Sequence, residues 1–528
     1  MSMIEALLRV EAYPHAVDKV EKVETHISWV FLAGAFVYKV KKPVDFGFVD
    51  FSTEAKRRYF CHEELRLNRR LAPRWYLEVV PIVYRQNTWF VGGEGEVVDH
   101  AVKMRRFPEH SRLDRLAAAG CLDPAQIDAV IRRIAAFHGA IPAADVSSSY
   151  GEPLQVLQPM LDNIATLSQC LQEAPPVQQV LAMESWIRQC FEALQGHLRH
   201  RKATGYIREC HGDLHLGNMA WVEGEPLIFD CLEFNPALRW IDVSSELAFF
   251  LMDLDDRGRR DLSRRALDLY LQSTADYAGL PLLRFYQHYR ALVRAKVACL
   301  RWSQQQREHP AGAQQDVEPQ HVMEYVRLAE SYMRPLSPGV IITVGFSGSG
   351  KTRLTSALLE QFDVIRVRSD VERKRLAGLE PEQRSGSQVD AGIYQSRFTE
   401  VTYQRLAHIA EEALKAGWPV LVDATFLSAG YRSRFQRLAE AYGVPFVILF
   451  VDAPREVLFE RVRRRLQRGG DASEATAEVL ESQLQRFSGL SEAERHMSIM
   501  IDTAGAVDVP ALAQRLVGRL SGTPQRLS

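Results

Sequence analysis

The first 110 residues alternate short apolar and polar positions in the manner of β-strands. Five runs have this pattern and are expected as strands: residues 26–32, 36–40, 77–83, 89–91 and 97–104. Between the second and third runs, residues 53–71 have helical spacing with many acids and arginines, and Pro73 ends them. The pattern predicts a small sheet accompanied by one helix.

From about residue 112 to 333 the apolar positions recur with helical spacing. The clearest helices are expected at residues 124–138, 177–198, 262–277 and 282–306. Residues 207–241 interrupt them with Gly, Asn and Pro among short apolar runs, which predicts loops and short strands inside a helical lobe. A polar linker is expected at residues 304–320, which hold two prolines, and one more helix leads to a major boundary near residue 336.

Beyond this boundary, apolar runs expected as strands alternate with helical segments. The strands are expected at residues 340–345, 364–368, 419–423 and 446–451, and the helices at 351–361, 394–416 and 456–468. Such alternation is typical of right-handed crossovers between parallel strands. The C-terminal part is therefore predicted to be an α/β domain with a parallel sheet.

Composition narrows the class of protein without naming it. The 528 residues are 46% hydrophobic and 25% charged, which excludes a mainly disordered, collagen-like or membrane-embedded chain. The net charge of -1 provides no global attraction to nucleic acid or anionic lipid. The most apolar stretch, residues 247–252, is far shorter than the roughly 20 residues of a membrane span, so we expect neither membrane insertion nor export.

The seven cysteines all lie in the first 300 residues and include no C-x-x-C pair. An odd number without paired spacing argues against a disulfide framework and against a zinc ribbon, and it suits a reducing cytoplasm. The expected location is therefore cytoplasmic.

A phosphate-binding motif opens the C-terminal part. The chain reads Gly345-Phe346-Ser347-Gly348-Ser349-Gly350-Lys351-Thr352, which satisfies G-x-x-x-x-G-K-[ST] after an expected strand and before an expected helix. The glycines let backbone N–H groups turn toward phosphate oxygens at a helix N-terminus. Lys351 would reach the β- and γ-phosphates and the Thr352 hydroxyl would hold Mg²⁺, whereas the alternative is a plain glycine turn.

Two aspartates follow the next strands. Asp370 comes directly after residues 364–368, at the carboxyl end of a parallel strand where ligands bind, and could take the proton of an acceptor hydroxyl. Asp423 ends residues 419–423 and resembles a Walker-B-type acid beside a metal ion. For both residues the alternative is a helix N-cap.

An arginine-rich helix is expected at residues 456–468. Arg461 and Arg465 are four residues apart on the same helix face and could close over a transferring phosphoryl group. Arg463 and Arg468 fit a solvated basic face better.

Over residues 340–520 these motifs resemble the nucleoside- and sugar-kinase-like branch of P-loop proteins, which includes polynucleotide kinases, gluconate kinases and zeta-type toxins. The resemblance implies that Asp370 is the acceptor base and that Arg373 is a substrate-binding arginine. It does not specify one substrate.

The most informative string in the chain is His211-Gly212-Asp213-Leu214-His215-Leu216-Gly217-Asn218. An Asp five residues before an Asn in a tight loop provides a base for an incoming hydroxyl and an amide oxygen for Mg²⁺. The following strand ends in Asp230, a second metal-binding carboxylate. The string could instead form a zinc site at His211 and His215, which lacks an evident third ligand, or a purely structural loop.

This string resembles the H-G-D-x-H-x-x-N loop of the aminoglycoside phosphotransferase and choline kinase group, and the resemblance covers residues 23–333. It implies that Asp213 is the catalytic base, that Asn218 and Asp230 are metal ligands, and that Asp242 supports the loop.

The same resemblance assigns the ATP-phosphate lysine to Lys39, in the run 36–39, and its partner to Glu64. Lys41 and Lys42 stay open as candidates for the lysine, as does Glu63 for the glutamate. An ordinary surface ion pair is also possible.

The order of the modules resembles bacterial fusions of an aminoglycoside phosphotransferase-like protein with a P-loop kinase. The fold class expected from it is multidomain: an α+β bilobal protein-kinase-like module with lobes at residues 1–110 and 111–335, then an α/β P-loop module at residues 337–528. We expect an ATP-dependent phosphotransferase with two Mg²⁺·ATP sites that act on hydroxyl acceptors. The alternative is a nucleotide-sensing protein in which one module binds ATP without transfer. The acceptor, a small molecule or a nucleic-acid end, is not specified, and no protein partner is evident.

Overall fold

The computed structural model describes residues 2–47, 49–171, 177–308, 319–380, 383, 395–468 and 476–522. Packing divides the chain into a first unit, Met1–Gly258 with Phe285–Glu330, and a second unit, Arg259–Arg284 with Ser331–Ser528. Residues 259–284 thus pack with the P-loop sequence, although they precede the expected boundary near residue 336. The expected lobe and module boundaries stay predictions, and residues 309–318 of the expected linker lie outside the described residues.

An antiparallel sheet forms the smaller lobe of the first unit. Its described strands run in the order β1-β2-β3-β6-β4-β5. Their bounds are β1 Val20–Glu24, β2 Ser28–Ala33, β3 Phe36–Lys41, β4 Tyr76–Arg85, β5 Thr88–Val91 and β6 Glu96–Arg105. The five expected strands are confirmed with small shifts at their ends. β1 was not expected, because it is an edge strand with mostly exposed residues and so has no apolar core face to reveal it.

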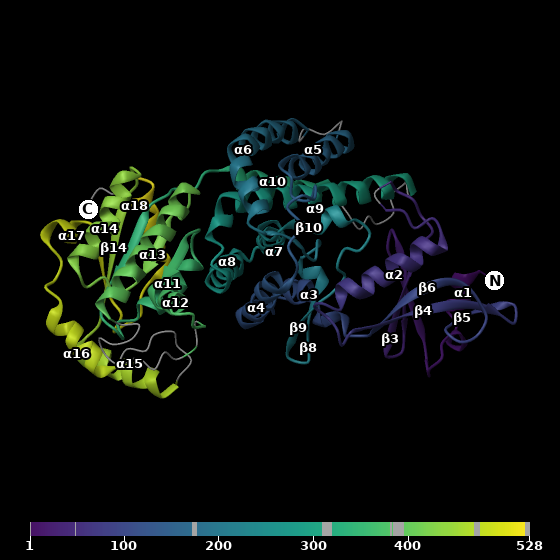
Figure 1. The fold of residues 1–528 in the computed structure, drawn as a ribbon, viewed down its shortest axis with the longest axis horizontal. Helices are drawn as coiled ribbons and strands as arrows, with labels where there is room; N and C mark the ends of the chain where they lie inside the picture. The colour runs from purple at the N-terminus through teal and green to yellow at the C-terminus, as the bar shows by residue number, and fades with distance from the viewer. Residues whose placement is uncertain are drawn as a thin grey trace. The chain divides into compact units, whose positions relative to one another are not determined.

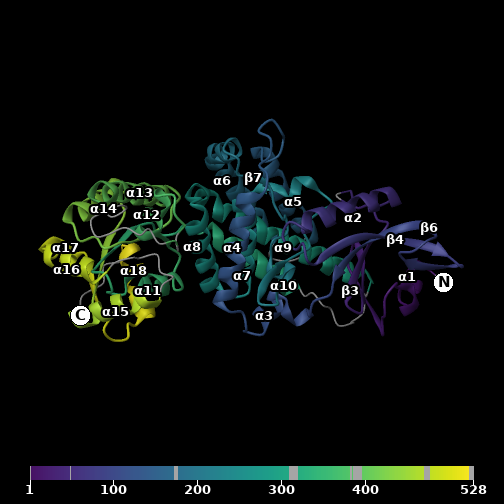
Figure 2. The same cartoon turned by 60° about the horizontal axis from the view of Figure 1, so that its bottom comes forward.

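Helix α2, Glu54–Asn68, lies along one face of this sheet (Figures 1 and 2). Cys61 and Leu65 of α2 pack with Tyr76 and Val102 of the sheet. The opposite face packs against the N-terminal helix α1, Met3–Leu7, through a second apolar cluster. α2 begins where Thr53 caps it, and it carries Glu64 toward the sheet face that holds the candidate lysines.

The rest of the first unit is mainly helical. Its longer helices are α4 Pro124–Ala140, α5 Pro153–Cys170, α6 Val177–Ala203, α7 Val243–Asp256, α9 Leu280–Glu308 and α10 Pro319–Met333. The expected interruption is confirmed as short strands, β7 Ile207–Glu209, β8 Met219–Val222, β9 Glu225–Ile228 and β10 Trp240–Asp242. α7 was not expected, because its residues 243–254 are buried all round and therefore show no amphipathic period.

A disulfide joins Cys170 of α5 to Cys299 of α9. The 129 residues between them gave no paired spacing, so the sequence argument against disulfides is wrong for this pair. Helix packing alone brings the two cysteines together. Among the described residues, no helix is long and apolar enough to cross a membrane.

The second unit contains a parallel sheet with strand order β12-β13-β11-β14-β15. The bounds are β11 Val340–Val344, β12 Ile365–Arg368, β13 Val420–Asp423, β14 Phe446–Asp452 and β15 Ser498–Asp502. The central strand β11 is buried throughout, as expected for a parallel sheet covered on both faces. The four expected strands are confirmed, and β15 is an additional edge strand whose Met500 is exposed.

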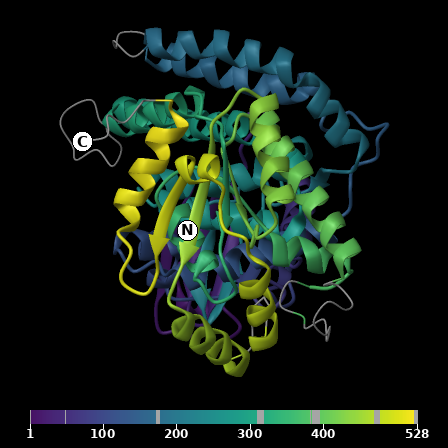
Figure 3. The same ribbon diagram turned by 90° about the vertical axis from the view of Figure 1, so that its left-hand side faces the viewer.

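Helices cover both faces of the parallel sheet (Figure 3). On one face, α11 Lys351–Leu359 and α18 Val509–Leu520 pack against it through Leu358 and Leu516. On the other lie α13 Ser396–Lys415 and α14 Ala429–Ala441. Three further helices surround the carboxyl ends of the strands: α12 Ser369–Leu376, α15 Arg455–Arg468 and α16 Ala477–Arg486.

Helix α8, Arg260–Thr274, also belongs to the second unit (Figure 1). It packs against α11 and β12. Arg264 of α8 lies 2.7 Å from Asp363, and Asp268 accepts two hydrogen bonds from Arg366 of β12. The P-loop domain is therefore extended by a helix that the chain supplies before the P-loop sequence begins.

Candidate active sites

The loop between β7 and β8 forms the first candidate site. The side-chain amide of Asn218 donates to the backbone oxygen and to Oδ2 of Asp213, both at 2.9 Å. Nε2 of His215 lies 3.4 Å from the same Oδ2. Burial alone would raise the pKa of Asp213, but the neighbouring His215 prevails and lowers that pKa. Asp213 is thus an oriented carboxylate, and its side chain is 40% exposed and open to a substrate.

Two carboxylates of α7 hold this loop from below. The Gly212 N–H donates to Oε1 of Glu246 at 2.7 Å, and Oε2 of Glu246 lies 2.9 Å from Nε2 of His138. The Leu216 N–H donates to Oδ2 of Asp253 at 2.9 Å. Both backbone groups are buried, so these acceptors satisfy donors that would otherwise destabilise the loop.

The structure corrects the role expected for Asp242. Its carboxylate accepts two hydrogen bonds from Arg201, at 2.6 and 2.8 Å, and caps α7 by accepting from the Ser244 N–H. Glu246, one turn further along α7, supports the catalytic-type loop instead. The sequence placed the support in the correct segment and on the wrong acid.

Asp230 follows β9 and reaches the same site. Its backbone has a left-handed φ of 63°, and its N–H donates to the hydroxyl of Tyr76 at 3.1 Å. Nε2 of His211 donates to the carbonyl of Phe229 at 2.9 Å and so joins the loop to the end of β9. Asp213, Asn218 and Asp230 are brought together on adjoining segments, as the motif spacing predicts.

The structure favours Lys39 over its competitors for the phosphate-binding position. Nζ of Lys39 lies 2.6 Å from Oδ1 of Asp230 and 2.9 Å from Oε1 of Glu64. Lys41 also contacts Glu64, at 2.8 Å, but its side chain is fully buried and pairs with Glu233. Burial would lower the pKa of Lys39, yet Asp230 and Glu64 raise it. A charged Lys39 at the loop can therefore meet a phosphate, whereas Lys41 anchors Glu64.

Lys42 and Glu63 have their partners away from this loop. Lys42 pairs with Glu24 at 2.6 Å on an exposed edge. Glu63 lies 2.9 Å from Arg66 and 3.4 Å from Arg239. The assignments of Lys39 and Glu64 remain predictions that this geometry supports.

Sequence reasoning missed Arg294 of α9. Burial would lower its pKa, but Tyr325, Asp253 and Asp213 raise it, so the guanidinium lies within electrostatic reach of the predicted base. It donates hydrogen bonds to the hydroxyl of Tyr325 in α10 at 3.2 and 3.3 Å. No local motif marks it, since arginines recur throughout α9.

A zinc site at His211 and His215 finds no support in the residues that the structure describes. These two histidines contact Phe229 and Asp213. The group with metal-type donors within mutual reach is instead His138, Cys210 and Glu246, all buried. Two of its donors already form the hydrogen bond that supports Gly212.

The second candidate site begins at the phosphate loop between β11 and α11. A Cβ at Gly345 would overlap the carbonyl oxygen of Val451, and one at Gly348 would lie 2.7 Å from that of Leu458. Only glycine fits at either position, which explains the motif in this packing. Gly350 has a φ of 87° and forms the N-cap of α11.

Lys351 folds back over this loop. Its Nζ donates to the carbonyls of Gly345 and Phe346, at 2.9 and 2.7 Å. Burial lowers the pKa of Lys351 to about 8, while the charges of Asp423 and Asp370 oppose this decrease. An anion at the loop would offset the desolvation of the lysine.

A cavity of about 1190 Å³ brings most of the predicted residues together. The predicted residues that line it are Ser347, Gly348, Gly350, Lys351, Thr352, Asp370, Arg373, Asp423, Arg461 and Arg465. Gly345 and Ser349 are not in its lining, although both belong to the loop that forms one wall. Carboxylates, a hydroxyl and a phosphate-binding loop therefore share one space.

Asp423 and its neighbours form a buried hydrogen-bond chain. Oδ2 of Asp423 accepts from the hydroxyl of Thr355 at 3.1 Å, and Nε of Arg368 lies 4.0 Å away. Thr355 in turn accepts from Arg366 at 3.2 Å. The carboxylate of Asp423 is thereby fixed beside Thr352 and the phosphate loop, as a metal-binding acid requires.

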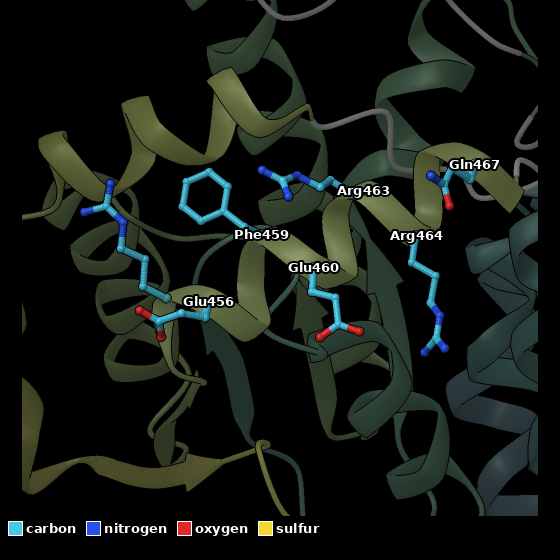
Figure 4. A pocket seen from close by; sticks show the side chains of 7 residues that line it. Glu456, Phe459, Glu460, Arg463, Arg464 and Gln467 are labelled. Carbon is cyan, nitrogen blue, oxygen red and sulfur yellow. The ribbon is translucent and has the colours of Figure 1, made fainter.

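The two predicted lid arginines face this cavity from α15. Arg461 donates to the backbone oxygen and hydroxyl of Thr503, at 2.7 and 2.9 Å, and contacts Gly348 O at 3.4 Å. Arg463 is exposed, in agreement with a solvated face, and the side chain of Arg468 lies outside the described residues. A separate hollow of about 560 Å³ on the outer side of α15 is lined by this helix alone (Figure 4).

Comparison with known proteins agrees with these two sites. The family model described as "Phosphotransferase enzyme family" matches residues 54–286, and the one described as "AAA domain" matches residues 340–490. Fold, motifs and matches together define the chain as a kinase, with a kinase-like phosphotransferase module followed by a P-loop kinase module. Lys39 and Arg294 lie outside the matched ranges.

Curated relatives extend over nearly the whole chain. An uncharacterized protein of Mycobacterium tuberculosis strain H37Rv is 30% identical over 482 residues, which cover 91% of this chain and 92% of the relative. An uncharacterized protein of Mycobacterium bovis has the same figures. The chain belongs to the same family as these mycobacterial proteins. An adenylyl-sulfate kinase of Myxococcus xanthus is 31% identical over 163 residues, 30% of this chain and 76% of the relative.

Two solved structures illustrate the likeness in fold. A choline/ethanolamine kinase family protein from Mesorhizobium loti has a TM-score of 0.38 and 13% identity, over 63% of this chain and 95% of that one. The APS kinase of Mycobacterium tuberculosis, in complex with AMPPNP and APS, has a TM-score of 0.26 and 19% identity, over 35% of this chain and 99% of that one.

Proposed function

We propose that the protein has two Mg²⁺·ATP sites and transfers the γ-phosphate to a hydroxyl acceptor at each. The observation that carries this proposal is the single cavity that joins the phosphate-binding Lys351 and Thr352 to the carboxylates of Asp370 and Asp423. A protein that only binds nucleotide has no use for a carboxylate base opposite the phosphate loop.

The residues of both sites suit magnesium. Mg²⁺ prefers oxygen ligands, and the first site offers the amide oxygen of Asn218 and the carboxylate of Asp230, whose side chain is 45% exposed. The second offers the Thr352 hydroxyl and Asp423 in the cavity wall. When bound, the ion would neutralise charge on the phosphates.

The chain's own residues divide the remaining work. In the first module, Asp213 accepts the proton of the acceptor hydroxyl as its oxygen forms a bond to the γ-phosphorus, and the bond to the β,γ-bridging oxygen breaks to release ADP. Lys39, held by Glu64, binds donor phosphate oxygens. In the second module Asp370 and Lys351 take these two roles.

The acceptors are the finer part of this proposal. Kinship with a phosphotransferase family supports a hydroxyl acceptor for the first module, and the relative named adenylyl-sulfate kinase supports a small acceptor for a P-loop module. We therefore expect small molecules at both sites, without a requirement for membrane or protein partner, in a cytoplasmic protein.

The test is transfer from γ-labelled ATP to a panel of aminoglycosides, sugars, nucleosides and 5′-hydroxyl oligonucleotides by the full chain. Asp213→Asn should abolish the products of the first module, with a rate loss of about 10²–10⁴-fold, and leave ATP affinity nearly unchanged. Asp18→Asn, an exposed change in the same unit, is the matched control. Unaltered transfer in Asp213→Asn would refute its role as the base.

Nucleotide stoichiometry tests the two-site claim. Titration with a non-hydrolysable ATP analogue and Mg²⁺ should give two sites in the wild type and in Lys415→Ala, an exposed control, and one site in Lys351→Ala. Asp370→Asn should keep both sites and lose transfer by the second module. One wild-type site that disappears in Lys351→Ala would contradict the proposal for the first module, and binding without transfer to any acceptor would favour a nucleotide-sensing protein.

A further inference from the structure

The cavity of the second unit carries a surplus of positive charge. Its cationic lining residues are Lys351, Arg353, Arg368, Arg373, Arg461, Arg465 and Arg486. Its acidic lining residues are Asp370, Asp423 and Glu478. Lys351, Arg461 and Arg465 belong to the phosphate loop and the helix beside it, and they account for the donor phosphates. Arg368 and Arg373 instead flank Asp370, where the acceptor must lie.

Arg373 is placed to hold part of the acceptor. It lies three residues after Asp370 on α12, so the two side chains share a helix face with Cβ atoms about 5–6 Å apart. The side chain is buried, and Nη1 donates to the hydroxyl of Thr399 at 3.1 Å. A group bound to Arg373 would therefore lie within one small molecule of the base.

Two tyrosines beside Arg373 form a flat aromatic surface. Tyr403 and Tyr431 both line the cavity, and their rings stack with centroids 3.9 Å apart and an angle of 1°. The Tyr403 hydroxyl accepts from the Phe426 N–H at 3.2 Å. The charge of Arg373 acts on both tyrosine hydroxyls, which shows that the guanidinium is close to each.

We propose that the acceptor of the second module is a small anionic molecule with a planar aromatic ring, of the mononucleotide class. This inference rests on the proposed phosphotransfer. The ring packs on the Tyr403–Tyr431 pair, the anionic group binds Arg373, and a hydroxyl faces Asp370. The hydroxyl oxygen attacks the γ-phosphorus, its proton passes to Asp370, and the products are ADP and the phosphomonoester of the acceptor.

A mononucleotide fits better than a nucleic-acid chain. The cavity of about 1190 Å³ must hold donor and acceptor together, which suits two small ligands. A polymer would need a wider basic surface to bind its phosphates, and the chain has a net charge of only -1.

The experiment measures binding to the full chain saturated with Mg²⁺ and AMPPNP, so that the probes cannot enter a donor site. The probes are the 5′-monophosphates of adenosine, guanosine, cytidine and uridine. Adenosine, ribose 5-phosphate and ribose lack the anion, the ring and both. At least one monophosphate should bind more than tenfold tighter than adenosine and than ribose 5-phosphate.

The variants separate the two contacts. Arg373→Gln should weaken monophosphate binding about tenfold to a hundredfold and leave adenosine binding unchanged, with Arg373→Lys intermediate. Tyr431→Ala should weaken the monophosphate and adenosine by a similar factor and leave ribose 5-phosphate unchanged. Arg463→Gln and Tyr442→Ala, both exposed and outside the cavity, are matched controls that should change nothing. Unchanged AMPPNP affinity shows that each variant is folded.

Several results would overturn the inference. They are a neutral probe that binds as tightly as its anionic counterpart, no binding by any monophosphate, faster transfer to a 5′-hydroxyl oligonucleotide than to a mononucleotide, or loss of AMPPNP affinity in Tyr431→Ala. The last would assign the tyrosines to the donor. Correct binding with no labelled product would refute the proposed function alone, whereas transfer to neutral sugars would refute the acceptor class alone.

Discussion

Replacing Asp268 with alanine should destabilise the P-loop unit, although Asp268 lies 72 residues before its first strand. Oδ1 and Oδ2 of Asp268 accept from Nε and Nη2 of Arg366 at 3.2 and 2.6 Å. The two side chains are only 7% and 6% exposed. Arg366 also donates to the hydroxyls of Thr355 and Ser356, so α8 is tied to the hydrogen-bond chain that ends at Asp423.

The expected magnitude follows from this burial. Removing one partner of a buried ion pair leaves an uncompensated charge, which costs about 3–5 kcal/mol. Asp261, also on α8, pairs with Arg259 at the surface, and losing such a pair costs about 1 kcal/mol or less. The double variant Asp268→Leu/Arg366→Met removes both charges and should recover most of the loss.

Native-state hydrogen exchange followed by mass spectrometry measures this effect unit by unit. In Asp268→Ala, amides of β12 and α11 should exchange about 10²–10³-fold faster, while those of β2 and β3 in the first unit keep their rates. Asp261→Ala is the control on the same helix. The reasoning fails if Asp268→Ala resembles Asp261→Ala, or if the double variant exchanges as fast as the single one.

Three further predictions concern other parts of the chain. Burial lowers the pKa of His288 to about 4, below the usual 6.5 of the unfolded state; its stabilising effect, about 3 kcal/mol, is complete above pH 6.5 and lost as the pH falls toward 4, so urea unfolding of His288→Gln should depend less on pH over that range. Reduction of the Cys170–Cys299 disulfide should destabilise the first unit by about 4–5 kcal/mol, the loop-entropy value for 129 residues, and a reductant that leaves the melting temperature unchanged would contradict the bond. Gly345→Ala should abolish one of the two AMPPNP sites in calorimetry, because its methyl group overlaps the carbonyl of Val451, and retention of both sites would show that the loop adapts.

Contiguous motifs explain why both sites could be located from the sequence. The phosphate loop spans eight consecutive residues between β11 and α11, and the loop from His211 to Asn218 also spans eight. Within such short segments the local backbone decides which groups meet, so residue type and spacing are sufficient. Asp370 and Asp423 were accessible for a related reason, since the carboxyl ends of parallel strands meet at one edge of the sheet.

Edge strands and fully buried helices were harder to recognise. β1 is mostly exposed and α7 is buried throughout, so neither shows the one-sided apolar period that identifies an element in the sequence. The disulfide and the placement of α8 with the P-loop unit depend on helix packing, which no local pattern records.

The sequence by itself determined the two kinds of phosphate chemistry in this protein, and the tertiary structure decided which distant side chains serve them. Lys39 and Lys41 are equivalent in sequence until Asp230, 191 residues away from Lys39, pairs with one of them. Likewise Tyr403 and Tyr431 become one surface only when α13 and α14 pack side by side. Ion pairing and stacking act over a few ångströms, and only the fold sets those distances for residues far apart along the chain.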